Sequence, residues 1–163
     1  MIFMDIYKVD EKTYGWIFAL LSVSFIGSSQ LNSMLLKKYT SEQLIRAALI
    51  SQSIISIIFL IGVMNDVFNL YGIIAMFFLF LSCLGLSNPN TAGLALAPFE
   101  KNAGSASAMM GASQMILGSI ASIAVGIFVK NSMVPITVIL LVSSIVALVI
   151  LTVGKKSIKR NHS

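Results

Sequence analysis

The most constraining feature of this sequence is a series of five stretches without Asp, Glu, Lys or Arg: 13–36, 47–65, 67–99, 102–129 and 131–154. Crossing the hydrocarbon core of a bilayer takes roughly 20 helical residues, and each stretch is long enough. Inside a bilayer, an α-helix satisfies its own backbone hydrogen bonds, whereas an open strand does not. The sequence therefore predicts an all-α integral membrane protein with five transmembrane helices, over about 13–36, 44–64, 69–97, 103–129 and 134–153.

Composition limits the classes of function. Only 10% of the 163 residues are charged, whereas a soluble domain carries about a quarter. The net charge is +5, but the charges lie between the apolar stretches and form no basic face with aromatic residues, so we expect no nucleic-acid binding. Cys83 is the only cysteine and His162 the only histidine, which leaves no cluster for a disulfide, a metal or a catalytic group. The sequence thus predicts no enzyme, cofactor or metal site.

The basic residues indicate the orientation of the chain. If successive loops alternate between the two sides, one side holds Lys8, Lys12 and Lys130. The other side holds the remaining eight, which are Lys37, Lys38, Arg46, Lys101, Lys155, Lys156, Lys159 and Arg160. Short cytoplasmic loops carry the excess of Lys and Arg. We therefore predict an outside N-terminus, a cytoplasmic C-terminus and a cytoplasmic basic loop with Lys37, Lys38 and Arg46.

Pro89 interrupts the third stretch. Its missing N–H leaves the carbonyl of Gly85 without a helical donor, so we expect a helix kink at Gly85 and Pro89. In hydrocarbon that carbonyl needs another partner, and the side-chain amides of Asn88 and Asn90 are nearest. Two interpretations stay open: a structural kink with a satisfied backbone, or amides that line a polar cavity.

The fourth stretch carries a stripe of small residues at helical spacing. Its members recur at steps of three, four or seven: Gly104, Ala108, Gly111, Gly118, Ser122 and Gly126. Small residues let two helices approach closely in lipid, where hydrophobicity cannot drive them together. The stripe predicts a helix-packing seam, and the sharper alternative is the lining of a moving interface.

The other stretches carry weaker signals. The first sets a second small-residue face along one side, formed by Gly15, Ala19, Ser22, Ser29 and Ser33. The second and fifth are rich in branched aliphatic residues, and helices of this kind can face lipid. No acidic or basic residue lies well inside any stretch, so the chain supplies no residue of the kind that couples protons to transport.

Neutral amides are the remaining candidates for a site. The substrate-cavity candidates are Gln30, Asn88, Asn90 and Gln114. A buried amide in lipid also serves as an interhelical hydrogen bond, which contributes about 0.6 to 2 kcal/mol. For each of the four residues, both roles stay open.

Three segments of the central region carry a resemblance to a known family. They are Asn88-Pro89-Asn90, Ala95-Leu96-Ala97-Pro98-Phe99 and Ala103-Gly104-Ser105-Ala106-Ser107-Ala108, followed by Gln114, Gly118 and Ser122. Together they resemble the bicyclomycin-resistance (Bcr/CflA) branch of drug:proton antiporters, which are twelve-helix transporters of the major facilitator superfamily. The resemblance extends over nearly the whole chain. It implies that the five spans correspond to helices eight to twelve, that residues 1–4 end helix seven, and that the N-terminal six-helix half is absent.

The same family has a cytoplasmic motif after helix eight, in which a glycine in the helix precedes basic residues and a tight turn. The matching residues here are Gly27-Ser-Ser-Gln-Leu-Asn32 and Lys37-Lys38-Tyr39. Thr40 stands where the family usually has glycine. This departure leaves the tight turn and its gating role open.

The resemblance implies part of a multidrug efflux transporter in the bacterial inner membrane, a multi-pass drug:proton antiporter that is inactive as this chain alone. In these antiporters the coupling carboxylate belongs to the N-terminal half. The implied partners are the lipid bilayer, an N-terminal transporter half from the same gene upstream or from a separate chain, and small lipophilic drugs after assembly. Two alternatives remain: a non-transporting membrane scaffold or modulator, and a non-functional remnant of a truncated or split transporter gene.

Overall fold

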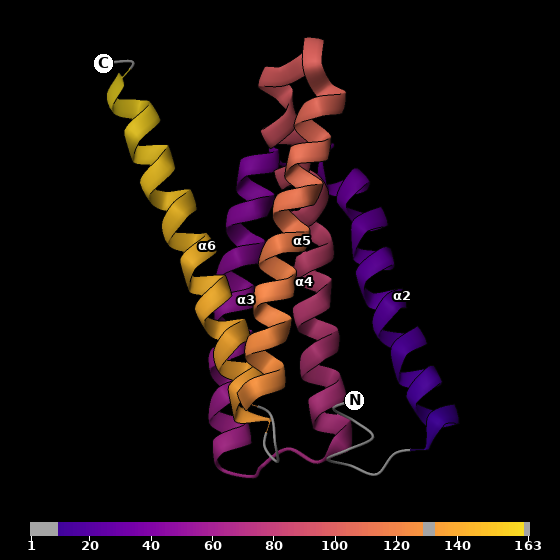
Figure 1. Ribbon diagram of the computed structural model, residues 1–163. Helices are drawn as coiled ribbons and strands as arrows, with labels where there is room; N and C mark the ends of the chain where they lie inside the picture. Colours follow the sequence, from indigo (N-terminus) through magenta and orange to yellow (C-terminus); the bar gives the residue numbers. More distant parts are fainter. Residues whose placement is uncertain (1–9, 129–132, 162–163) are drawn as a thin grey trace.

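The computed structural model describes residues 10–128 and 133–161, which form an all-helical structure without strands (Figure 1). The α-helices are α2 (Glu11–Leu35), α3 (Ser41–Met64), α4 (Leu70–Leu96), α5 (Ala103–Phe128) and α6 (Val134–Asn161), and a 3-10 helix, η1 (Ala97–Asn102), joins α4 to α5. Within these residues, five helices are long and apolar enough to cross a membrane. This result confirms the predicted helices. Residues 1–4, expected to end a preceding helix, lie outside the described residues.

The helix ends follow local capping signals. Thr40 begins α3 with a capping box, in which its Oγ1 accepts from the Gln43 N–H at 3.4 Å and its own N–H donates to Gln43 Oε1 at 3.1 Å. Thr40 has a φ of −77°, so the turn before α3 needs no glycine at this position. Asn69 caps α4 by accepting from the Gly72 N–H at 3.0 Å. Lys37 and Lys38 lie exposed in the loop between α2 and α3.

Pro89 does not end α4, which continues as one helix to Leu96. The side-chain amide of Asn90 donates to the carbonyl of Leu86 at 2.8 Å, one residue beyond the carbonyl that we expected it to satisfy. The chain leaves α-helical geometry further on, at Phe99 in η1 (φ −110°, ψ 31°). The turn between the two helices is therefore built around Pro98 and Phe99.

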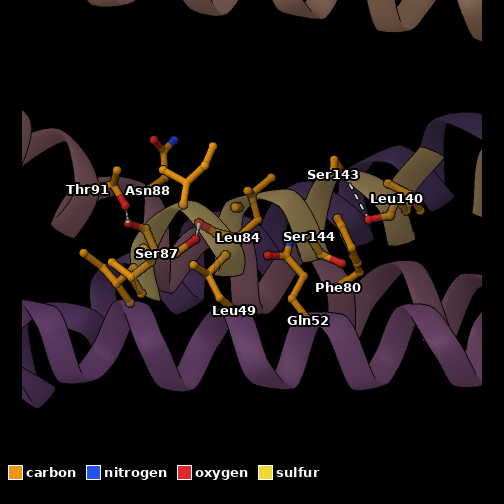
Figure 2. A pocket seen from close by; sticks show the side chains of 14 residues that line it. Leu49, Gln52, Phe80, Leu84, Ser87, Asn88, Thr91, Leu140, Ser143 and Ser144 are labelled. Carbon is orange, nitrogen blue, oxygen red and sulfur yellow. Dashed lines mark hydrogen bonds between the residues drawn. The ribbon is translucent and has the colours of Figure 1, made fainter. Parts of the chain in front are cut away.

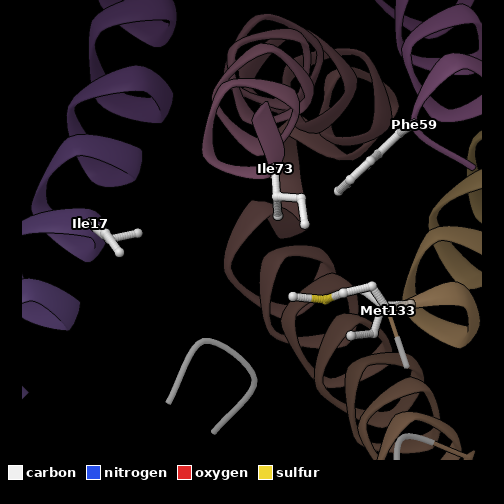
Figure 3. Close-up of a cluster of buried hydrophobic side chains, with 5 residues drawn as sticks. Ile17, Phe59, Ile73 and Met133 are labelled. Atoms are coloured by element: carbon white, nitrogen blue, oxygen red, sulfur yellow. The ribbon is translucent and has the colours of Figure 1, made fainter. Parts of the chain in front are cut away.

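The packing centres on α3 and α4. Helix α2 packs on α4, and α6 packs on the opposite side of α3. A buried apolar cluster closes the end of the bundle where α3 leads into α4 and α5 into α6, and its members are Ile17, Phe59, Ile73, Met133 and Ile136 (Figure 3). The ring of Phe59 makes edge contacts with Phe77 at 5.2 Å and Phe68 at 6.1 Å between centroids.

The structure shows which sides of α2 and α3 pack within the described bundle. The α2 residues that pack inward are Ile17, Ser24, Ser28 and Asn32, not the predicted small-residue face, whose members are all exposed or only half-buried. One side of α3 is buried between α4 and α6. That side carries Gln52, Ser53, Ser56 and Phe59, and the isoleucine-rich side is exposed. The side of α3 that packs against its neighbours is therefore the side with its serine and glutamine residues.

At Gly85, α2 and α4 approach each other closely. A Cβ at this position would collide with the carbonyl oxygen of Phe25 and with Ser28 Oγ. Because one of these atoms belongs to the backbone, a side chain at position 85 forces the two helices apart. Gly85 therefore has a role in helix packing, and the kink expected at Gly85 and Pro89 stays a prediction.

We expect Gly85→Ala to lower the free energy of unfolding by about 1 to 3 kcal/mol, the usual cost of overpacking. Gly93→Ala is the matched control, since it lies on the same helix and a Cβ there meets nothing within 4 Å. Unfolding of the purified chain in detergent micelles, followed by circular dichroism, measures both. Equal stability of the two variants would contradict the close contact.

Candidate functional site

Hydroxyl groups join α2 and α4 near mid-helix. Ser24 Oγ donates to the carbonyl of Phe78 at 2.6 Å and lies 2.7 Å from Ser82 Oγ. Ser28 Oγ, against Gly85, donates to the carbonyl of Ser24 at 2.7 Å. In lipid such contacts hold helices together because no water competes for the hydroxyl groups. These residues serve packing.

Two asparagines continue this interface. Asn90 Nδ2 donates to Asn32 Oδ1 at 2.6 Å as well as to the Leu86 carbonyl. Asn90 is 3% exposed and Asn32 is 4% exposed. Asn90 Oδ1 is buried and has no hydrogen-bond partner among the described residues. Of the two interpretations of Asn90, the structure shows the interhelical hydrogen bond.

A groove of about 600 Å³ lies on the other side of α4, between α3, α4 and α6. Leu49 and Gln52 rise from α3 into it, α4 contributes residues from Phe80 to Thr91, and α6 contributes residues from Leu140 to Leu151 (Figure 2). Asn88 lines this groove. Two residues apart on one helix, Asn88 and Asn90 therefore face nearly opposite directions.

The hydroxyl groups of the groove are satisfied by their own helices. Ser87 donates to the Leu84 carbonyl at 3.2 Å and Ser144 to the Leu141 carbonyl at 2.9 Å. The side-chain amides of Gln52 and Asn88 make no hydrogen bond with another described residue. Gln52 is only 4% exposed. The groove thus presents two free amides between apolar walls, an arrangement that suits an uncharged or lipophilic molecule with a hydrogen-bonding group.

The other two predicted amides lie elsewhere. Gln30 is exposed on α2 and Gln114 is exposed on α5, and neither lines the groove. The four candidates therefore do not converge on one site. Sequence reasoning passed over Gln52, whose signal is an amide within a Ser-Gln-Ser run of an otherwise aliphatic helix.

The predicted seam on α5 has no partner within the described part of the chain. A Cβ at Gly104, Gly111, Gly118 or Gly126 would meet nothing within 4 Å. Ala108 and Ser122 are exposed. A role in packing against another chain stays a prediction.

In the described residues, the acidic and basic side chains lie at or near the helix ends. Lys37, Lys38 and Arg46 are exposed, and the side chain of Thr13 holds the pKa of Asp10, just before α2, below its usual value. Among the residues that the structure describes, no group of three His, Cys, Asp or Glu side chains is placed to bind a metal ion. The side-chain groups that this site can use for binding are therefore neutral amides.

We expect the Asn32–Asn90 pair to show a coupling free energy of about 0.5 to 2 kcal/mol, because each amide loses its partner when the other is removed. The measurement is a double-mutant cycle with Asn32→Ala and Asn90→Ala, based on unfolding in detergent. Asn88→Ala, on the groove side of α4, is the control and should add to Asn32→Ala without coupling. Additive effects of Asn32→Ala and Asn90→Ala would show that the pair does not hold the helices together.

Comparisons of the chain with protein-family models, with curated proteins and with solved structures find no match. The resemblance described from the sequence therefore depends on the quoted segments themselves. The described residues form an all-helical structure with five helices long and apolar enough to cross a membrane.

Proposed function

We propose that this chain is part of a multidrug efflux transporter of the bacterial inner membrane, one that exchanges protons for small lipophilic drugs. The observation that carries the proposal is the α3–α4–α6 groove, where the free amides of Gln52 and Asn88 lie between apolar walls. The segments that resemble the Bcr/CflA antiporters support it, as do the five apolar helices. Drug selectivity in such a groove would come from shape and one or two hydrogen bonds.

Proton coupling requires a partner in this proposal. The described helices hold no acidic or basic residue well inside their spans, and coupling normally uses an intramembrane carboxylate or histidine. An N-terminal transporter half, encoded upstream or as a separate chain, would supply that group. This chain would contribute one wall of the drug path and would not transport alone.

A membrane scaffold or modulator is the second candidate. It is favoured by α5, which has no buried residue in its apolar window 103–126 and carries a small-residue stripe. Such a helix is available for packing against another protein. Stoichiometric co-purification with a six-helix chain that bears an intramembrane Asp or Glu favours the transporter, and recovery without one favours the scaffold.

Drug binding tests the groove directly. We expect Gln52→Leu and Asn88→Leu each to weaken binding of ethidium, a lipophilic cation, by about 5-fold, because each loses one hydrogen bond worth about 1 kcal/mol. Gln30→Leu is the control, since that amide lies outside the groove. Fluorescence titration of the purified chain in detergent gives the dissociation constants. Equal binding by all four proteins would remove the groove as the drug site.

Transport assays in vesicles test whether proton coupling requires the N-terminal half. We expect inverted vesicles that contain only this chain to show no ethidium accumulation driven by a proton gradient. Accumulation by this chain alone would contradict the requirement for a partner that supplies the coupling group.

Orientation is a separate prediction, derived from the basic residues. We expect a tag at Met1 to be accessible from outside the cytoplasmic membrane and a tag at Ser163 only from the cytoplasm. Protease protection in spheroplasts and in inverted vesicles measures this. Accessibility of both tags from one face would contradict a topology with an odd number of spans.

A further inference from the structure

One exposed side of α2 changes from charged to amphipathic to apolar along the helix axis. Lys12 is exposed, and Trp16 follows one turn later with 75% of its side chain exposed. Leu20 and Val23 come next and are 47% and 65% exposed. These four residues lie at steps of three or four, so they share one side of the helix. The side of α2 that packs on α4 is formed by other residues, and this side therefore contacts the surroundings of the bundle.

Tyr71 of α4 lies at nearly the same level as Trp16. Ser24 forms a hydrogen bond with Ser82, 58 positions later, and the bonded asparagines of the same two helices are also 58 positions apart. Tyr71 follows Thr13 by the same interval, so it is level with a residue about 5 Å before Trp16 along α2. The side chain of Tyr71 is 78% exposed. Figure 1 shows the first turns of both helices at the same end of the bundle.

The chemistry of these side chains indicates what surrounds them. Trp16 and Tyr71 each combine a large apolar ring with one hydrogen-bonding group. Water alone would leave the rings exposed, and hydrocarbon alone would leave the N–H and O–H groups unsatisfied. The boundary between acyl chains and headgroups satisfies both parts, which is why Trp and Tyr are enriched there. Lys12 lies one turn further out, where its flexible side chain brings the ammonium group to a lipid phosphate.

The length of α2 agrees with this placement. About 20 helical residues, or about 30 Å, separate Trp16 from Leu36. Leu36 directly precedes Lys37 and Lys38, which are exposed. The hydrocarbon core of a bilayer is also about 30 Å thick. With Trp16 at one surface of this core, the two lysines therefore lie at the other surface, and only uncharged residues of α2 lie between them.

We propose that Lys12, Trp16 and Tyr71 bind the phospholipid headgroups of one leaflet, which is the outer leaflet in the predicted orientation. Lys12 lies at the level of the phosphates. The indole N–H of Trp16 and the phenol O–H of Tyr71 donate to ester or phosphate oxygens, and Leu20 and Val23 lie among the acyl chains. These contacts fix the depth of α2 and α4 in the bilayer. The inference is independent of transport.

Tryptophan fluorescence of the full chain in liposomes tests this placement without any substitution, because Trp16 is the only tryptophan. Bromine atoms on lipid acyl chains quench a tryptophan that lies at the same depth. We expect a larger loss of Trp16 emission with lipids brominated next to the ester group than with lipids brominated near the chain ends. A larger loss with the chain-end bromines, or an equal loss with both lipids, would overturn the proposal.

A second tryptophan position on α2 is the matched control. Ile26→Trp in a Trp16→Phe background places the indole on the same helix, at a site that is also exposed. It lies ten residues further along α2, about 15 Å deeper and near the middle of the core. We expect the chain-end bromines to cause the larger loss there. The same order of quenching at both positions would show that the Trp16 level is not the headgroup boundary.

Tyr71 is tested by the same measurement on α4. In the Trp16→Phe background, we expect Tyr71→Trp to be quenched most by bromines next to the ester group, as Trp16 is. Lys12→Trp should lose less emission to either brominated lipid and more to acrylamide in the water, since it lies one turn further out. Stronger quenching of Tyr71→Trp by the chain-end bromines, or a greater depth for Lys12→Trp than for Trp16, would contradict the proposal. Loss of ethidium binding would leave it unaffected.

Discussion

The close approach of α2 and α4 at Gly85 is the contact on which the rest of the arrangement depends. Without a Cβ on Gly85, the Phe25 carbonyl and Ser28 lie against the α4 backbone. That proximity brings Ser24 within hydrogen-bonding distance of Phe78 and Ser82, and Asn32 within 2.6 Å of Asn90. In lipid, helix association comes from such packing and hydrogen bonding and not from burial of apolar surface. One glycine thus determines which polar groups of two helices meet.

The fixed α2–α4 pair also determines what remains free for binding. Because Asn90 is turned toward α2, Asn88 is turned toward α3 and α6, where it joins Gln52 in the groove. The groove hydroxyls bond to their own helices, so the two amides are its available polar groups. Packing and binding therefore use opposite faces of the same segment of α4.

The number and limits of the helices were predictable because they follow from the absence of charge over lengths set by the bilayer. The packed faces were not. Helix α2 has serines on several sides, and Ser24 and Ser28 differ from Ser22 and Ser29 only in which of them faces α4. Asn88 and Asn90 are also equivalent in the sequence, since both flank Pro89. Only the structure shows which of them faces α2 and which lines the groove. The burial of Gln52 was missed because α3 looks like a lipid-facing helix unless its serine and glutamine stripe is given a neighbour.

The link between α3 and α4 has a consequence for biosynthesis. After Met64 the chain reverses through a Schellman motif, with Asp66 left-handed (φ 52°) and the Val67 and Asp66 N–H groups donating to the carbonyls of Gly62 and Val63. The Phe68 ring then lies against Gly62, and its edge meets Phe59. All of these contacts are local in sequence, so α3 and α4 can pair as a hairpin as soon as both have left the ribosome. Helix α2 is made earlier, and its contact at Gly85 forms only after that part of α4 has been synthesised.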